Sequence, residues 1–253
     1  MINHNQKKYS QLENPLMKLA LMQPYFFPYI GYFQLIHAVE TFIIYDTVNY
    51  IKNGWIKRNR YLLNGTIKYL SLSVSEASSH KLITDTYISD EERLHSKERI
   101  SKTIQMAYSK APRFNRIFPL LNTLILNEEQ SIANYNTYIL RELCSYLDIE
   151  TEILQGSEVL TESPLTGQDR VIEICKTFKA DHYINPIGGL DLYDRKSFNS
   201  QDIKLTFLKT SDGIRYRQWD DNFFPNLSII DVLMFNSKQE IATLLEKYRL
   251  ISQ

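Results

Sequence analysis

Cysteine and long apolar runs are scarce in this chain. Its 253 residues include two cysteines, Cys144 and Cys175, too few for a disulfide framework or a cysteine-based metal site. This favours a reduced, cytoplasmic compartment. No apolar run approaches the roughly 18 residues that a membrane-spanning helix needs. The 29 basic and 29 acidic residues give a net charge of zero, so composition indicates neither nucleic acid nor a membrane surface as a partner.

The common catalytic motifs are also missing. The sequence has no Walker loop, no G-x-G-x-x-G, no G-x-S-x-G and no H-E-x-x-H. No two histidines have the spacing of metal ligands, so no metal site is expected. Cys144 and Cys175 lie in helical apolar patterns and are expected to be small core residues rather than nucleophiles. The sequence therefore identifies no cofactor.

The chain is long enough, and apolar enough, for one large domain. Hydrophobic residues make up 43% of it and aromatic residues 12%, with 17 tyrosines. The first 16 residues are polar and lack the apolar segment of a signal peptide, so we expect a disordered extension, with Met17 as a candidate alternative start. Residues 17–253 are expected to form a single α/β domain with a helical insertion at about 92–147.

The opening of the domain predicts a β-strand, a turn, a helix and a second strand. Residues 19–22 are a short apolar run typical of a buried parallel strand. Pro28 and Gly31 flank the turn into a helix over about 29–39, and a second buried strand over 42–45 ends at Asp46. Asn64-Gly65 between apolar runs then predicts a hairpin with a type I′ turn.

The rest of the chain predicts helices followed by a return to α/β structure. Three apolar stripes indicate helices between about 92 and 147. A short strand is expected over 150–154, and longer ones over 181–185 and 203–208, with a loop at 186–189. Capping boxes are expected where helices begin after Thr166, Ser228 and Ser237. The predicted fold class is therefore α/β, with a mainly parallel core sheet, a β-hairpin and a helical insertion.

Two polar side chains come directly after predicted parallel strands. Gln23 follows the first strand and is a candidate ligand-binding amide, or alternatively satisfies backbone groups of the turn. Asp46 closes the second strand as a candidate general base, sugar-hydroxyl ligand or arginine partner. Its alternatives are a helix N-cap or an ion pair with Arg58 or Arg60. Ligands of open α/β sheets bind at the carboxyl ends of strands.

A basic stretch follows the second strand. No acidic residue occurs from 47 to 75, and Trp55 lies there beside five cations. These cations are Lys52, Lys57, Arg58, Arg60 and Lys68. Arginine forks suit phosphate or carboxylate, which favours an anion site. Trp55 is a candidate for stacking on a base or a sugar. The alternative is a solvated basic loop.

Other candidates carry less specific signals. His37 lies in a helix among apolar residues, where a partly buried structural histidine is favoured over a catalytic base, and His182 is interpreted in the same way. Gly188 and Gly189 permit close backbone approach to a ligand. Asp231 is explained by capping, although a helix start also binds anions.

Taken together, these motifs resemble the WbqC family, a bacterial group encoded in O-antigen and other surface-polysaccharide clusters. The resemblance covers about residues 17–236, with later matches at 108–112, 172–176, 188–189 and 227–231. Asn49 departs from the family pattern, which has glutamine there. The opening matches are Gln23, Pro24, Phe26, Pro28, Gly31, Tyr32, Phe33, Asp46, Trp55, Arg58, Asn59 and Arg60.

The resemblance implies work on nucleotide-activated sugars, with acyl or aminoacyl transfer onto a sugar amine. It also implies a Rossmann-like sheet that loosely resembles nucleotidylyltransferases, although Ile30-Gly31-Tyr32-Phe33 replaces the H-x-G-H signature of that superfamily. That replacement argues against simple nucleotidyl transfer.

The resemblance also gives the candidate residues their expected roles. Lys57, Arg58 and Arg60 are expected to hold an anionic group, and Asp46 to act as the base, with His37 as a second catalytic candidate. The substrate-orienting residues are expected to be Gln23, Asn49 and Asn59. An acidic acyl or aminoacyl carrier protein is a candidate partner for the basic stretch. The alternative function is non-catalytic binding of a sugar nucleotide or a partner enzyme.

Overall fold

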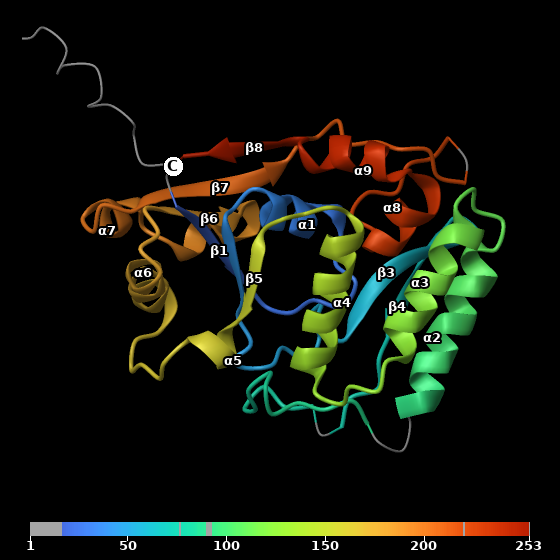
Figure 1. Ribbon diagram of the computed structural model, residues 1–253, viewed down its shortest axis with the longest axis horizontal. Helices are drawn as coiled ribbons and strands as arrows, with labels where there is room; N and C mark the ends of the chain where they lie inside the picture. Colours follow the sequence, from blue (N-terminus) through green and yellow to red (C-terminus); the bar gives the residue numbers. More distant parts are fainter. Residues whose placement is uncertain (1–16, 76, 90–92, 220, 253) are drawn as a thin grey trace, which may run out of the picture.

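The core of the protein is a mainly parallel sheet, seen in a computed structural model that describes residues 17–75, 77–89, 93–219 and 221–252 (Figure 1). The expected extension, residues 1–16, lies outside the described residues. The sheet has six strands in the order β5–β2–β1–β6–β7–β8. They are β1 (Lys18–Met22), β2 (Thr41–Ile44), β5 (Glu152–Gln155), β6 (His182–Pro186), β7 (Lys204–Thr210) and β8 (Tyr248–Ile251).

The sheet confirms the predicted fold class. Strands β1, β2, β5, β6 and β7 pair in parallel, whereas β8 pairs antiparallel with β7. The chain winds from β1 to β2 on one side and later returns to β6 on the other side of β1. The strand order therefore reverses between β1 and β6, where doubly wound sheets bind ligands.

Alternating side chains bury both faces of the sheet. Ala20 of β1 and Phe42 of β2 belong to one hydrophobic cluster, whereas Leu19 and Ile43 belong to another. This is the two-residue period of a strand covered on both sides. The first cluster includes residues of α1 (Ile30–His37), α8 (Ile229–Phe235) and α9 (Lys238–Leu245), and the second includes residues of α6 (Gly167–Thr177) and α7 (Arg195–Asn199).

The predicted hairpin forms a separate two-stranded sheet of β3 (Arg58–Leu63) and β4 (Thr66–Ser71). Its turn residues Asn64 and Gly65 have φ angles of 49° and 69°, as a type I′ turn requires. Arg60 pairs with Tyr69 and Arg58 pairs with Ser71. Arg58, Arg60 and Tyr69 therefore lie on one face of the hairpin.

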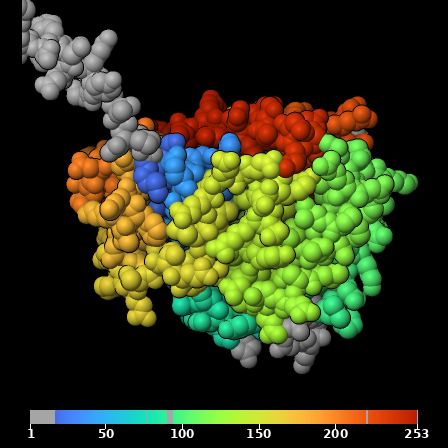
Figure 2. Space-filling view, in the orientation of Figure 1, coloured from blue at the N-terminus to red at the C-terminus, as the bar shows by residue number. Residues whose placement is uncertain are grey.

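The helical insertion packs on the same core as the sheet. Its helices α2 (Arg93–Tyr108), α3 (Phe114–Leu126) and α4 (Ile132–Tyr146) lie side by side (Figure 1), and this segment covers much of the face seen in Figure 2. Asn136 of α4 donates to the carbonyls of Pro24 (2.9 Å) and Ile56 (2.7 Å). Tyr135 stacks on Phe26. The insertion thus fixes the two loops that follow β1 and β2.

The three predicted capping boxes have different outcomes. At α9 the box is complete, because Ser237 and Glu240 each bond the other's backbone. At α8 Ser228 accepts from the Ile230 amide, but Asp231 bonds other side chains, so the predicted box is wrong there. At α6 Thr166 makes no side-chain cap. Local sequence specified where these helices begin, and tertiary contacts decided how their ends are satisfied.

Several short elements were not predicted from the sequence. Gly156–Val159 forms α5 directly after β5, and strand β8 closes the far edge of the sheet. The segment after β6, expected to be a loop, is a 3-10 helix, η1 (Ile187–Leu192). These elements are four to six residues long, too short for a clear apolar period.

Candidate functional site

A cavity of about 660 Å³ opens at the carboxyl ends of β1, β6 and β7, where the strand order reverses. Its volume is within the range of roughly 300–1,000 Å³ that small-molecule sites occupy. We call it the carboxyl-edge cavity. Its main walls are the turn after β1, the start of β3, and the loop from β7 to α8. The polar and aromatic residues of these walls include Tyr25, Tyr29, Trp55, Asn59, Arg60, Lys209, Thr210, Asp212, Arg215, Tyr216, Phe223 and Asn226.

The turn after β1 is held in place by two distant side chains. The amide of Asn59, on β3, donates to the carbonyls of Phe26 and Phe27, both at 3.0 Å. Ser228 also donates to the Phe27 carbonyl at 2.8 Å. Phe27 has a φ of 41°, which is uncommon for a bulky residue and needs surrounding structure to hold it. The wall formed by Tyr25 and Tyr29 is therefore rigidly placed.

Helix α1 begins at the cavity and depends there on a glycine. A Cβ at Gly31 would collide with the ring of Tyr29 and would lie 2.8 Å from Thr210 Oγ1. Thr210 is itself fixed by donating to Gln34 at 2.7 Å. The first turn of α1 has no acidic residue and its N-cap makes no side-chain bond, so its backbone dipole adds positive potential to the cavity.

Arg60 and Trp55 form the wall next to the hairpin. The guanidinium of Arg60 lies 5.4 Å from the centre of the Trp55 ring and donates to the Asn226 carbonyl at 2.8 Å. Trp55 stacks in turn on Tyr69, and Arg58 lies over the Tyr69 ring at 4.9 Å. We call Arg58, Tyr69, Trp55 and Arg60 the arginine–aromatic stack. It holds the planar fork of Arg60 ready for an anion.

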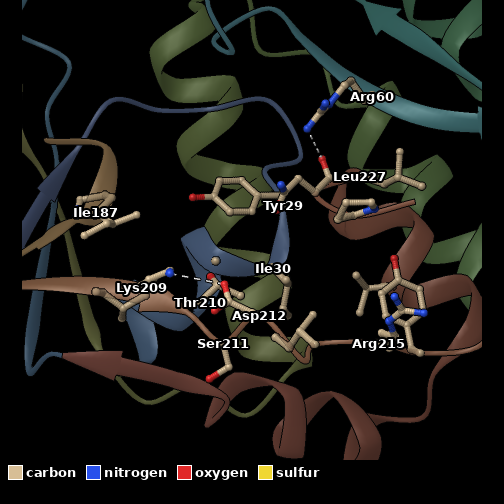
Figure 3. Close-up of a pocket in the computed structure, with 18 of the residues that line it drawn as sticks. Tyr29, Ile30, Arg60, Ile187, Lys209, Thr210, Ser211, Asp212, Arg215 and Leu227 are labelled. Atoms are coloured by element: carbon tan, nitrogen blue, oxygen red, sulfur yellow. Dashed lines mark hydrogen bonds and ion pairs between the residues drawn. The ribbon is translucent and has the colours of Figure 1, made fainter. Parts of the chain in front are cut away.

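A second group of charges lies across the cavity from Arg60. In Figure 3, Lys209 and Asp212 lie on the side of Tyr29 away from Arg60. Asp212 pairs with Lys209 at 3.4 Å and with Arg249 at 3.6 Å. Its side chain is 75% exposed, so it is accessible to a ligand. With Arg215, the described lining carries three cationic side chains and one carboxylate.

A buried carboxylate anchors the loop from β7 to α8. Asp231 is fully buried and accepts from Tyr216 (2.7 Å), Tyr108 (3.0 Å) and Gln218 (2.9 Å). Burial raises the pKa of Asp231, although the hydrogen bonds oppose this. Gln218 also bonds both backbone groups of Phe224. The loop that forms the far wall is therefore attached to α8 through this one carboxylate.

The structure brings only some of the predicted residues to the cavity. Trp55, Asn59 and Arg60 line it. Asn59 is 3% exposed, and its side chain holds the turn after β1 rather than facing a ligand. Gln23 and Lys57 are partly buried beside the cavity but do not line it. Gln23 accepts the Tyr32 hydroxyl through its backbone carbonyl, at 2.8 Å.

Asp46, the predicted base, lies outside the cavity and is fully buried. Its carboxylate accepts from the Ser157 amide (2.8 Å), the Ser157 hydroxyl (2.6 Å) and the Gln155 side chain (2.9 Å). Because Ser157 is in the first turn of α5, Asp46 caps that helix from the neighbouring strand. The capping alternative accounts for the bond from the Ser157 amide, and the Ser157 hydroxyl and the Gln155 side chain supply the other two donors.

Other candidates lie away from the cavity. His37 is exposed at the far end of α1 rather than partly buried as expected, because it lies on the outer face of the helix while its neighbours Ile36 and Ala38 are buried. Asn49 is exposed and does not line the cavity. Gly188 and Gly189 fall in η1 and do not line it either. Gly189 is needed for packing, because a Cβ there would overlap the Asn185 side chain.

The sequence interpretation missed most of the cavity wall. Tyr25 and Tyr29 were overlooked within the aromatic turn, and burial raises the pKa of both, so their hydroxyls stay neutral at pH 7. Asp212 and Arg215 follow β7 just as Gln23 follows β1. The same strand-end argument, applied to the last parallel strand, points to both residues.

The described part of the chain offers neither a metal site nor a membrane-spanning helix. No group of three or more histidine, cysteine, aspartate or glutamate side chains there is placed to hold a metal ion. Among those same residues, no helix is both long enough and apolar enough to cross a membrane.

Comparison with known proteins agrees with the resemblance seen in the motifs. The chain is 29% identical over 224 residues to an uncharacterized protein of Mycobacterium tuberculosis, Rv1507c, covering 87% of this chain and 94% of the relative. No solved structure shows significant similarity. The family model of the WbqC-like proteins matches residues 23–243. This match includes the turn after β1, the stack and the anchored loop, and the chain belongs to the WbqC-like protein family.

Proposed function

We propose that this protein is a cytoplasmic transferase of surface-polysaccharide (O-antigen) biosynthesis that modifies a nucleotide-activated amino sugar held in the carboxyl-edge cavity. The reaction is transfer of an acyl or aminoacyl group onto the sugar amine. The observation that carries the proposal is the position of an aromatic, cationic cavity where the strand order reverses. Sugar nucleotides combine a base and a sugar, which stack on aromatic rings, with phosphates, which bind arginine.

In this proposal the ligand lies across the cavity. Arg60, already fixed by Trp55 and the Asn226 carbonyl, binds phosphate. The amine of the sugar then faces the opposite wall, where Asp212 is the exposed carboxylate. Asp212 replaces Asp46 as the group that orients or deprotonates the amine, because Asp46 is buried and fully hydrogen-bonded. The donor is an acyl or aminoacyl thioester of a carrier protein: the amide bond forms as the C–S bond breaks, and the carrier thiol leaves with the proton taken from the amine. An acidic carrier suits the basic stretch beside the cavity.

The second candidate function is non-catalytic binding of the same ligand. It is favoured by the composition of the wall, because the described lining includes no cysteine and no histidine. A binding protein returns its ligand unchanged. A transferase consumes a second substrate and releases a product of higher mass.

A thermal-shift screen tests the binding step. The purified protein is mixed with nucleotide-activated amino sugars, other nucleotide sugars and free nucleotides. A ligand at about 100 times its dissociation constant adds about 2.7 kcal/mol to the free energy of unfolding. We expect one nucleotide-activated amino sugar to raise the melting temperature, and Arg60→Met to remove that rise. Arg116→Met, on the exposed surface of α3, is the matched control.

Mass spectrometry of the same ligand with acyl and aminoacyl donors tests the chemical step. An acylated sugar that forms with the wild type and fails to form with Asp212→Asn supports the transferase. Binding without any product across the donor panel would support the binding protein. No response to any ligand would contradict both.

A further inference from the structure

Two arginines of the stack carry unused hydrogen-bond donors. The Nε atoms of Arg58 and Arg60 are buried and have no partner among the described residues. Each guanidinium is held over a ring, Arg58 over Tyr69 and Arg60 over Trp55, and each bonds one backbone carbonyl. A buried donor without an acceptor is costly, so such atoms mark the position of a missing partner.

A third unused group lies near Arg58. Tyr50 is 1% exposed, and its hydroxyl has no partner among the described residues. Burial raises the pKa of Tyr50 to about 12, and the charge of Arg58 acts in the opposite direction. The phenol is therefore neutral at pH 7 and able to donate. Arg58 and Tyr50 together present two donors and one positive charge to an acceptor that the described residues do not supply.

The two arginines lie on the same face of β3, but only Arg60 lines the carboxyl-edge cavity. Arg58 and Arg60 are two residues apart on β3, so their side chains lie on one face about 6–7 Å apart along the strand. Arg60 lines the carboxyl-edge cavity, whereas Arg58 lies outside it. No residue from 47 to 75 is acidic. The described residues place no ion pair on either arginine, so both positive charges are available.

We infer that Arg58 and Tyr50 form a second anion position beside Arg60, and that the pair of positions binds a diphosphate group. One phosphate lies on Arg60 at the cavity mouth and the other on Arg58 and the Tyr50 hydroxyl outside it. This inference rests on the proposed function and narrows its ligand to a diphosphate-linked sugar, as opposed to a sugar monophosphate. The sugar then enters the cavity, and the group on the other side of the diphosphate lies along the exposed ring of Tyr69.

Binding at the two positions shifts the rings packed on the two guanidiniums, Tyr69 on Arg58 and Trp55 on Arg60. Tyr69 is 52% exposed, and its ring contacts Trp55 and Arg58, so it is able to move outward. Trp55 lies between the two positions and reports the change. Because the chain has two tryptophans, a Trp219→Phe background leaves Trp55 as the single tryptophan, which selective excitation distinguishes from the tyrosines.

Calorimetry with inorganic pyrophosphate and inorganic phosphate tests the inference without choosing a nucleoside. Trp55 fluorescence in the Trp219→Phe background gives an independent readout. We expect Arg58→Met to weaken pyrophosphate binding by about 10-fold or more, the scale of a lost charged hydrogen bond, and phosphate binding by less than about 3-fold. Arg60→Met should weaken both. Tyr50→Phe should weaken pyrophosphate binding without lowering the melting temperature, because none of the described residues bonds its hydroxyl. Arg116→Met and the exposed Tyr138→Phe are the matched controls.

The outcomes separate this inference from the proposed function. Pyrophosphate binding that is lost in Arg60→Met but unchanged within about 2-fold in Arg58→Met and Tyr50→Phe would overturn the second position and leave the cavity site standing. Equal affinity of the wild type for phosphate and pyrophosphate would overturn it as well. Failure of the wild type to bind pyrophosphate, nucleotides and nucleotide sugars alike would overturn both.

Discussion

The two halves of the sheet's carboxyl edge differ although similar sequences lead into them. Above β1, β6 and β7 the edge opens into the carboxyl-edge cavity. Above β2 and β5 it is closed by Asp46, which joins β2 to Gln155 and Ser157. A polar residue comes after β1 and β2 alike, yet Asp46 is fully buried. A more open hollow of about 590 Å³ on its side of the edge is lined by Gln155 and Ser157 and not by Asp46.

The difference comes from the connection that leaves each strand. After β5 the chain enters α5 at once, and a Cβ at Gly156 would lie 2.9 Å from the Ile44 carbonyl and 3.0 Å from Asp46. That close approach leaves no space beside Asp46. After β1 a turn of seven residues, 23–29, leads away from the sheet before α1 begins. The direct entry of β5 into α5 therefore leaves no room beside Asp46, whereas the turn after β1 has room for the cavity.

Both halves are also held by a buried aspartate. Asp46 closes its half of the edge, whereas Asp231 fixes the loop that forms a wall of the open half. Each is fully buried and accepts three hydrogen bonds from side-chain or backbone donors. A buried aspartate thus closes one half of the edge, whereas in the other half a buried aspartate holds a wall of the cavity in place.

The largest loss of stability is expected from Asp231→Ala, which removes the support of the open half. The change leaves the hydroxyls of Tyr108 and Tyr216 without their acceptor and removes one of the acceptors of the Gln218 amide. We expect a loss of about 3–5 kcal/mol in the free energy of unfolding, measured by urea denaturation. Asp191→Ala, at an exposed position, is the control. A loss below about 1 kcal/mol would contradict the anchoring role.

Asp46→Asn sharpens the contrast between the two halves. The new amide places donors against the Ser157 and Gln155 donors, so we expect a loss of about 1–3 kcal/mol in stability. Ligand affinity of the cavity should stay within about 2-fold, as measured by calorimetry. The base role predicted from the sequence gives the opposite pattern, a stable protein whose turnover falls by at least about 100-fold. Measuring both quantities in one variant decides between them.

Gly31→Ala tests the open half directly. The added methyl group would push the Tyr29 ring toward the cavity, because Thr210 on the other side is fixed by Gln34. We expect pyrophosphate or nucleotide-sugar affinity to fall by about tenfold, within the usual cost of overpacking. Gly188→Ala, where a Cβ meets nothing within 4 Å, is the control. Unchanged affinity would show that the Tyr29 wall does not contact the ligand.

The smallest expected effect is a pH dependence of stability, which comes from His182 at the opposite, amino-terminal edge of the sheet. Burial lowers the pKa of His182 to about 4, with Lys204 and Lys18 adding to the effect. The unfolded chain titrates near 6.5, so between about pH 6.5 and 4 the unfolded state binds the extra proton and stability falls as the pH falls. Urea midpoints at pH 7 and pH 5 should therefore differ more in the wild type than in His182→Gln. Equal differences would exclude His182 as the source.

Part of the candidate site could be predicted from local sequence. The strands 19–22 and 42–45 were predicted from short apolar runs, and Asn64-Gly65 predicted the hairpin that carries Arg58 and Arg60. Trp55 and Arg60 were both predicted as binding residues of the acid-free stretch. Both line the carboxyl-edge cavity, and their role in binding stays a prediction. Asp212, Arg215 and Tyr216 were missed because the strand-end argument was applied to the strands 19–22 and 42–45 and not to the predicted strand 203–208. The sequence also does not show that the end of that strand meets the turn after β1 across the sheet.

By itself, the sequence determined the α/β class, the alternating faces of the strands, the type I′ hairpin and the family to which the chain belongs. The structural features among these depend on near neighbours in the chain: the period of the apolar residues sets the faces of the strands, and the φ angles that Asn64 and Gly65 allow set the turn. Only the tertiary structure decided that Asp46 closes one half of the edge while Asp231 supports the other. A carboxylate's role depends on which donors reach it. For Asp46 and Asp231 those donors come from segments brought close by the burial of apolar residues far apart in the chain.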